Sequence, residues 1–160
     1  MIYFFLKYVM GIFLWLLLRP RIYGRNNLKI KGKAIFVCNH ISMWDPVVLA
    51  VVSPRNIHFM AKKELFQSLP LRLFFESCLA FPVNRKSTDM QSLRNALRVL
   101  DKGKVFGIFP EGKRAVTDEL DEFERGAAFL AIRSGAPLIP IYISSGSYRK
   151  LRPTKVIAGE

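Results

Sequence analysis

The sequence predicts an α/β domain in which a layered sheet is flanked by helices. Short apolar runs of strand length alternate along the chain with segments of helical period, which is typical of α/β proteins. Residues 34–38 are apolar without alternation, as expected of a strand buried on both faces of its sheet. Several such runs end at polar residues, and in open α/β sheets the functional site lies beyond the carboxyl ends of the strands. With 160 residues, 51% of them apolar, the chain is long enough for one domain with a core.

The first 18 residues are almost wholly apolar, interrupted only by Lys7 and Gly11. As a helix they would rise about 27 Å, which is marginal for a membrane span of about 20 residues. Three interpretations stay open: a spanning helix, a helix in one leaflet with Lys7 reaching the surface, and a buried core helix. A signal peptide is disfavoured because Leu-Arg-Pro-Arg stands where a small-residue cleavage site would be. We assign residues 1–23 to an N-terminal membrane-anchoring segment and residues 24–160 to the α/β domain.

The chain is strongly basic, with a formal net charge of +13. Six cations follow the apolar segment closely: Arg19, Arg21, Arg25, Lys29, Lys31 and Lys33. Such a surface binds polyanions, and this distribution favours the cytoplasmic face of an anionic membrane. A nucleic-acid partner is disfavoured because no recognition-helix pattern or aromatic-rich exposed strand accompanies the charge.

The predicted strand at residues 34–38 leads directly to His40, and Asp45 with Pro46 opens the next helix, which runs through Val52. Histidine titrates near neutral pH and can take a proton from a hydroxyl. A carboxylate on its other ring nitrogen would fix the tautomer and stabilise the imidazolium. The same residues also fit a structural histidine and an ordinary helix start, since Asp is a favoured N-cap and Pro a favoured first residue. A metal site is disfavoured because no second ligand lies at the required spacing.

A strand is expected at residues 57–61, where His58 is interpreted as structural or exposed. Residues 62–76 form a strongly apolar, Phe-rich helical segment that is interrupted at Pro70. This segment fits the protein core, a second membrane-facing surface or the wall of a channel for an apolar ligand, and the sequence does not choose between these.

The second half of the chain continues the alternation of strands and helices. Asp89 is expected to cap an amphipathic helix, and Gly107 to permit close packing within a core strand. The expected strands lie at residues 78–83, 105–109, 137–143 and 156–158, of which 137–143 is expected to be buried. Helices are expected at 89–100 and 125–134, a basic connector at 24–33, a polar loop at 110–122 and a basic, loop-like segment at 148–155.

Four blocks of residues resemble the glycerolipid acyltransferases, a family that includes the lysophosphatidic acid acyltransferases. His40 and Asp45 form its His-x4-Asp motif. Residues 81–85 (Phe-Pro-Val-Asn-Arg), 109–114 (Phe-Pro-Glu-Gly-Lys-Arg) and 138–141 (Leu-Ile-Pro-Ile) resemble the three further blocks, in the same order. The resemblance implies that the α/β domain is an acyltransferase domain. Members of the family usually extend further, so a truncation at the C-terminus is expected.

The resemblance implies transfer of a fatty acyl group from acyl-CoA or acyl-ACP to the 2-hydroxyl of lysophosphatidic acid, which forms phosphatidic acid. His40 would act as general base and Asp45 would orient it. No acyl-enzyme is implied, so neither Ser42 nor Cys38 need be a nucleophile, and a strand position would bury the Cys38 thiol in the core. No metal or organic cofactor is implied.

Seven further residues are implied to hold the substrates: Asn84, Arg85, Glu111, Gly112, Lys113, Arg114 and Pro140. Arg85 can bind phosphate through its planar guanidinium, and Lys113 and Arg114 add positive charge. Glu111 would orient Arg85 or bind a glycerol hydroxyl, and Pro140 would shape the wall of the acyl-binding region. For each cation the alternative is an ordinary solvated surface position.

The chain departs from the family pattern in the third block, where Lys113 replaces a usual Thr and Ala115 a usual Ser. The His-Asp pair is unaffected, but the acceptor headgroup is left open. Alternative functions are therefore acyl transfer to glycerol 3-phosphate or to a different lysolipid, and a non-catalytic membrane-binding module.

Overall fold

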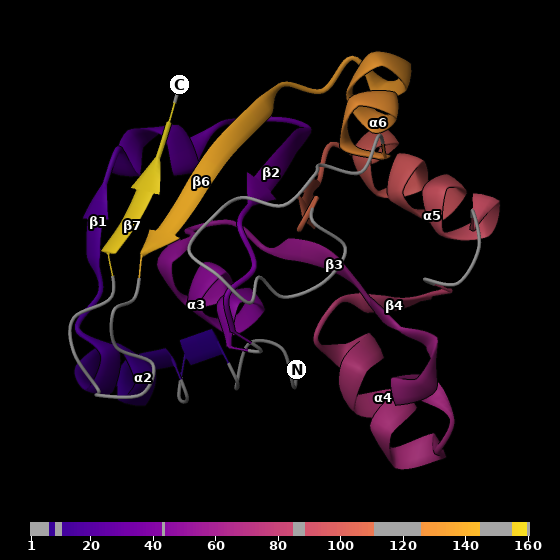
Figure 1. Ribbon diagram of the computed structural model, residues 1–160, viewed down its shortest axis with the longest axis horizontal. Helices are drawn as coiled ribbons and strands as arrows, with labels where there is room; N and C mark the ends of the chain where they lie inside the picture. The colour runs from indigo at the N-terminus through magenta and orange to yellow at the C-terminus, as the bar shows by residue number, and fades with distance from the viewer. Residues whose placement is uncertain are drawn as a thin grey trace.

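In the part of the chain that the structure describes, a single mixed sheet of seven strands organises the fold. The computed structural model describes residues 7–8, 11–42, 44–84, 89–110, 126–144 and 155–159. Across the sheet the order is β1-β7-β6-β2-β5-β3-β4, and every pair is parallel except β6 with β7 (Figure 1). The strands are β1 (Arg21–Tyr23), β2 (Ala34–Cys38), β3 (Ile57–Lys62), β4 (Ala80–Val83), β5 (Val105–Ile108), β6 (Leu138–Ser144) and β7 (Lys155–Ala158).

The helices form two layers, and the topology decides which layer each one joins. The helical elements are α2 (Gly11–Leu18), η2 (Arg25–Lys29), α3 (Asp45–Val52), η3 (Lys63–Phe66), α4 (Leu69–Ser77), α5 (Met90–Asp101) and α6 (Gly126–Ser134). Helices α3 and α4 connect β2 to β3 and β3 to β4, so the chain moves across the sheet toward β4. Helices α5 and α6 connect β4 to β5 and β5 to β6, so the chain then moves in the opposite direction. Because parallel β-α-β connections are right-handed, α3 and α4 cover one face of the sheet and α5 and α6 the other. Helix α2 contacts α3 and joins the first layer (Figure 1).

Strand β2 lies at the centre of the sheet and is buried on both faces, as its unbroken apolar sequence predicts. It pairs with β5 on one side and with β6 on the other. Gly107 of β5 lies opposite Phe36, and a Cβ there would come within 2.9 Å of Ile57 Cγ2 and would also meet the ring of Phe59. The prediction that Gly107 permits close packing is thereby confirmed.

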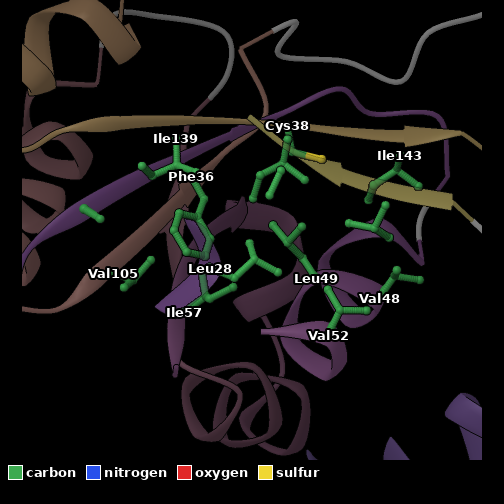
Figure 2. Close-up of a cluster of buried hydrophobic side chains, with 14 of the residues drawn as sticks. Leu28, Phe36, Cys38, Val48, Leu49, Val52, Ile57, Val105, Ile139 and Ile143 are labelled. Carbon is green, nitrogen blue, oxygen red and sulfur yellow. The ribbon is translucent and has the colours of Figure 1, made fainter. Parts of the chain in front are cut away.

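The two faces of the sheet carry separate core clusters. One is centred on Phe36 and includes Val48, Leu49 and Val52 of α3 (Figure 2). The other is made by Ile35 and Phe106 with residues of α5 and α6, among them Ala96, Leu100 and Leu130. Each face of the central strands is thus covered, which holds the carboxyl ends of β2 and β5 in fixed positions.

Helix α5 shows how local sequence sets an element. The side chain of Asp89 accepts hydrogen bonds from the backbone N–H groups of Gln91 and Ser92, at 3.0 and 3.1 Å, which confirms the predicted cap. Helix α6 ends where Gly135 takes a φ of 65° and its N–H donates to Ala131 O at 2.8 Å.

Three local predictions need correction. The basic connector at residues 24–33 contains the 3-10 helix η2, and strand β1 precedes it although its three residues carry no strand pattern. Pro70 does not interrupt a helix but stands in the first turn of α4, where its missing N–H costs no hydrogen bond. Strand β6 is not uniformly buried, since its residues alternate between buried and exposed.

The predicted N-terminal membrane helix is not found in the described part of the chain. Helix α2 has 8 residues and rises about 12 Å. Over the described ranges no helix combines the length and the apolar character needed to cross a bilayer. The predicted polar loop at residues 110–122 and the basic segment before β7 lie outside the described residues, except Pro110 and Lys155.

Candidate active site

The site is built where β2 ends, and its first fixed point is the side chain of Asn39. Asn39 Nδ2 donates to the carbonyl oxygen of Ile143 at 3.0 Å, and the N–H of Ile143 donates to Asn39 Oδ1 at 2.8 Å. Both bonds are buried. They continue the β2–β6 ladder beyond its last paired residues, Cys38 and Ile141, with a side-chain amide in place of a peptide group. The backbone that carries His40 is therefore held to the sheet after the strand has ended.

Asp45 fixes the ring of His40. The Nδ1 atom of His40 lies 2.8 Å from Asp45 Oδ2. The same oxygen accepts the backbone N–H groups of Ile41 and Ser42, each at 2.7 Å. Asp45 is completely buried, so this carboxylate is satisfied by protein donors. Since Oδ2 is an acceptor, Nδ1 must be the ring nitrogen that carries the proton, and Nε2 bears the free electron pair.

Asp45 is also the first residue of α3, but it does not cap that helix. The N-cap position is Trp44, and no side chain caps it. The carboxylate of Asp45 points back to the loop that links β2 with α3, while Pro46 follows in the first turn. Both interpretations of the Asp-Pro pair thus hold in part: a helix starts here, and its acidic first residue orients the histidine. A negative charge in the first turn also suits the helix dipole.

Phe109 covers one face of the His40 ring and was not anticipated from the sequence. The ring centroids are 4.4 Å apart, with an angle of 28° between the planes. Phe109 in turn stacks on Phe59 at 6.1 Å. The sequence signal is only that Phe109 ends an expected strand, as His40 follows the strand at residues 34–38. That these two strands pair in parallel, so that both residues leave the sheet at the same end, is known from the structure alone.

The imidazole is largely buried, with a small part of its surface open to solvent. His40 is 9% exposed, and its side chain is bounded by Asp45 on Nδ1 and by Phe109 on one face. Asp45 orients the imidazole and Phe109 shields one of its faces from water. Such an imidazole can take a proton from a hydroxyl that approaches Nε2. The geometry therefore matches a general base with its orienting carboxylate.

The substrate-binding residues inferred from the sequence have different outcomes. Asn84 directly follows β4, at the same carboxyl-terminal end of the parallel strands as His40, and its N–H donates to Asp89 Oδ2 at 2.9 Å. Pro140 is exposed in β6, opposite Val37, and alternates with residues that face the core around Phe36, so its ring lies on the other face of the sheet. Five residues lie outside the described ranges: Arg85, Glu111, Gly112, Lys113 and Arg114.

Cys38 is buried, as its strand position predicts. It is 1% exposed and belongs to the core cluster around Phe36 (Figure 2). Reactive thiols need an accessible and electropositive setting, which a core position does not provide. Cys78 is half-buried, and burial raises the pKa of its thiol. The thiols therefore offer no competing nucleophile to the His40–Asp45 pair.

Comparison with known proteins agrees with this geometry. Residues 19–144 match the Acyltransferase family. The chain belongs to the acyltransferase family. His40 and Asp45 lie at the spacing and distance that its His-x4-Asp motif requires.

Individual members of the acyltransferase family can be compared with the chain directly. It is 36% identical over 121 residues to the 1-acyl-sn-glycerol-3-phosphate acyltransferase of Bacillus subtilis. The aligned region covers 75% of this chain and 60% of that protein. It is 30% identical over 133 residues to the human 1-acyl-sn-glycerol-3-phosphate acyltransferase beta, covering 81% and 48%. The chain thus spans about half to three fifths of the length of these relatives.

The fold of the family is also known from a crystal structure. The structure of the 1-acyl-sn-glycerophosphate acyltransferase PlsC from Thermotoga maritima superposes with a TM-score of 0.73 at 22% sequence identity. The superposition covers 94% of this chain and 64% of that one. The two chains share the same α/β fold, with a mixed sheet flanked by helices.

Proposed function

We propose that this protein transfers a fatty acyl group from an acyl thioester to the 2-hydroxyl of lysophosphatidic acid and so forms phosphatidic acid. The observation that carries the proposal is the orientation of His40 by a buried carboxylate, which leaves Nε2 as the basic atom at the edge of the sheet. The relatives named above, which share the family, bear the name of this activity.

The proposed reaction is a direct transfer. Nε2 of His40 removes the proton of the 2-hydroxyl as its oxygen attacks the thioester carbonyl carbon, and Asp45 stabilises the imidazolium that forms. The tetrahedral intermediate collapses, the carbon–sulfur bond breaks, and the thiolate of CoA or acyl carrier protein takes the proton from Nε2. The imidazole is then neutral again, and the products are the ester and the thiol.

No covalent acyl-enzyme is needed in this scheme. Cys38 is buried in the core, and the Ser42 hydroxyl accepts a hydrogen bond from the N–H of Trp44 at 3.2 Å. Ser42 therefore has a local structural role in the loop between His40 and Asp45. This arrangement favours the lipid hydroxyl itself as the nucleophile.

The phosphate of the acceptor is assigned to Arg85, Lys113 and Arg114, with Glu111 and Gly112 shaping that block. These residues follow β4 and β5, strands that are parallel to β2 and therefore end at the same edge as His40. A planar guanidinium binds phosphate through two donors, and a lysine adds a point charge.

The proposed site of action is the cytoplasmic face of an anionic membrane. Helix α2 exposes Ile12, Phe13 and Leu16 at 60–67% of their surfaces. The cations that follow it, beginning with Arg19, lie where anionic headgroups would meet them. A lipid acceptor of the enzyme is present in that same layer.

The decisive experiment uses the full-length protein in anionic liposomes with labelled lysophosphatidic acid and acyl-CoA or acyl-ACP. We expect phosphatidic acid from the unaltered protein and a loss of about 10²–10⁴-fold in His40→Ala, because a general base contributes about that much. His58→Ala is the matched control, since His58 is the chain's other histidine and lies within β3. Its activity should equal that of the unaltered protein.

Two results would contradict the proposal. Equal activity in His40→Ala would remove His40 from the mechanism. Activity toward glycerol 3-phosphate or another lysolipid, in the absence of activity toward lysophosphatidic acid, would keep the mechanism but replace the acceptor.

A further inference from the structure

Helix α4 leaves its apolar side chains in solvent. All nine residues of α4 are described, and none of them is buried. Leu69, Leu71, Leu73 and Phe74 expose between 45% and 67% of their surfaces, and Leu65 in the preceding turn exposes 37%. A soluble protein rarely exposes so many large apolar side chains on one element, and such patches mark sites that contact another surface.

Among the described residues, α4 is attached mainly to η3 and β4. Its main aromatic contact joins Phe75 to Phe66 of η3, with ring centroids 5.6 Å apart, and Phe74 packs edge-on to Phe75 at 5.5 Å. Beyond η3, the helix packs on β4, which is an edge strand. Neither core cluster among the described residues includes a residue of α4. The helix is therefore held mainly through Phe75, and its three leucines are all exposed, Leu69 and Leu73 on one side of the helix and Leu71 on another.

The exposed leucines lie in the same layer as α2. Right-handed connections place α3 and α4 on one face of the sheet, and α2 contacts α3 on that face. In Figure 1, α2 lies at the lower left, α4 at the lower right and α3 between them, with α5 and α6 on the upper right. The apolar surfaces of α2 and α4 thus belong to one side of the protein, toward opposite edges of the sheet.

The dimensions of α4 argue against a second protein copy as the occupant. Nine helical residues span about 14 Å and a helix is about 10–12 Å wide, so the footprint is of the order of 150 Å². A stable protein interface buries about 800 Å² on each partner. A bilayer sets no such threshold, because each apolar side chain that enters the interface contributes separately.

The charges around α4 favour an anionic bilayer. Lys62 and Lys63 are both exposed at the start of η3. Arg72, within α4, forms an ion pair with Glu76 at 2.8 Å, so these two charges cancel. Glu64 offsets one lysine, which leaves the segment weakly positive in a chain of net charge +13.

We propose that α4 and η3 form a second membrane-contact surface, in which the leucines of α4 enter the boundary between headgroups and acyl chains. Lys62 and Lys63 would then lie at the level of the lipid phosphates. This contact is separate from the apolar segment at residues 1–18 and from the chemistry of His40. It would hold the sheet in a defined orientation on the bilayer, because contacts toward two opposite edges fix a tilt that one anchor leaves free.

The test places an environment-sensitive fluorophore on α4 of the full-length protein. Leu69→Cys, in a Cys78→Ser background, is labelled with a nitrobenzoxadiazole group; Cys38 is buried and is not expected to react. Ile132→Cys is the matched control, because Ile132 is 86% exposed but lies on α6, in the opposite layer. Leu73→Cys, at a position that is 55% exposed, repeats the test with a second site.

We expect vesicles of phosphatidylcholine with phosphatidylglycerol to brighten the label on α4 several-fold and to shift its emission to the blue. Lipids with a nitroxide in the acyl chain should quench it, whereas the label at position 132 should respond to neither. Vesicles of phosphatidylcholine alone should give a smaller response at position 69 because Lys62 and Lys63 lose their counter-charge.

The proposal is overturned if the α4 labels and the label at position 132 respond alike in protein that sediments with the vesicles. It is also overturned if the α4 labels brighten in vesicle-free protein as its concentration rises, because a second copy would then cover the helix. The readout needs no substrate, so His40→Ala should give the same fluorescence. A failure of the proposed enzyme activity is thereby distinguishable from a failure of this contact.

Discussion

One side chain holds the loops before β2 and β5, and another holds the loop after β2, but the two side chains have different effects. Before the strands, Arg55 donates to the carbonyl oxygens of Ile30, Gly32 and Gly103, in the loops that lead to β2 and β5; the Ile30 bond is 2.7 Å and the Gly103 bond 2.9 Å. After β2, Asp45 accepts from one ring nitrogen and two backbone N–H groups.

In each case one side chain binds at least three partners. All three partners of Arg55 are backbone groups, so this device can only hold loops together. One partner of Asp45 is the imidazole of His40, so Asp45 also determines which ring nitrogen of His40 carries the proton. Substitutions that affect the loops before β2 should therefore lower mainly the stability of the fold. Substitutions after β2 should also lower the catalytic rate.

The largest expected effect is that of Asp45→Asn on activity. The amide has nearly the shape of the carboxylate and can still accept from Ile41 and Ser42, but it carries no charge to stabilise the imidazolium. We expect kcat to fall about 10²–10⁴-fold, with a smaller change in the stability of the fold. Steady-state kinetics with parallel thermal unfolding checks both. A fall of less than tenfold in kcat would mean that Asp45 serves the loop alone.

Asn39→Ala should affect both properties. Removal of the amide leaves the N–H and the carbonyl oxygen of Ile143 buried without a partner, which costs about 2–4 kcal/mol of unfolding free energy. The end of β2 then loses the side-chain hydrogen bonds that hold it to β6. His40 is positioned less well as a result, so kcat should fall more than KM rises. Urea unfolding and kinetics measure the two effects, with Asn26→Ala as a control at an exposed asparagine. A stability loss with unchanged kcat would show that β2 alone positions His40.

Arg55→Ala should lower stability and leave catalysis intact. Three hydrogen bonds to backbone carbonyls are lost from a half-buried guanidinium, and we expect a cost of about 2–3 kcal/mol. The kcat of the folded fraction should not change. Arg98→Ala, at an exposed arginine of α5, is the control and should alter unfolding by less than about 0.5 kcal/mol. A lower kcat at full stability would contradict the separation of the two ends.

The smallest effect is expected at Asp89. Its carboxylate, like that of Asp45, accepts hydrogen bonds from backbone N–H groups, but it does so near the protein surface. Hydrogen bonds from the N–H groups of Asn84 and Ser92, and then of Gln91, lower the pKa of its carboxyl group. A lowered pKa in the folded state gives stability that is present above the unfolded value of about 3.9 and is lost as pH falls through the folded value.

We therefore expect Asp89→Ala to cost about 1 kcal/mol at neutral pH and progressively less below about pH 4. Asp89→Asn keeps the cap acceptor and should lose less. Urea unfolding at several pH values measures the difference. A cost for Asp89→Ala that stays constant down to pH 2 would show that the cap, and not the charge, accounts for it.

The sequence predicted the site better than its surroundings, for a physical reason. His40 and Asp45 are five positions apart on one strand-loop-helix unit, so their contact is local and follows from element boundaries alone. The bond between Asn39 and Ile143 depends on which strand lies beside β2, and one sequence contains no register. Phe109 reaches His40 for the same non-local reason.

Elsewhere the errors came from short or weak patterns. Strand β1 has three residues, Arg21–Tyr23, and forms because β7 offers it a ladder, not because of its own propensity. Pro70 reads as a helix breaker when the helix start is not known, yet it is favourable one residue after Leu69 begins α4. Of the four sequence blocks, the third lies outside the described residues apart from Phe109 and Pro110, and its predicted roles stay predictions.

The pairing of β1 with β7 has a consequence for how the chain is made. Arg21 pairs with Lys155, and the carbonyl oxygens of Ala158 and Gly159 both accept from the side chain of Asn27. A ribosome adds about 5–20 residues per second, so β7 begins to be made about 7–26 s after the synthesis of β1 is complete. Of the seven strands in the described part of the chain, β1 is therefore translated first and paired last, because β7, its neighbour in the sheet, is translated last.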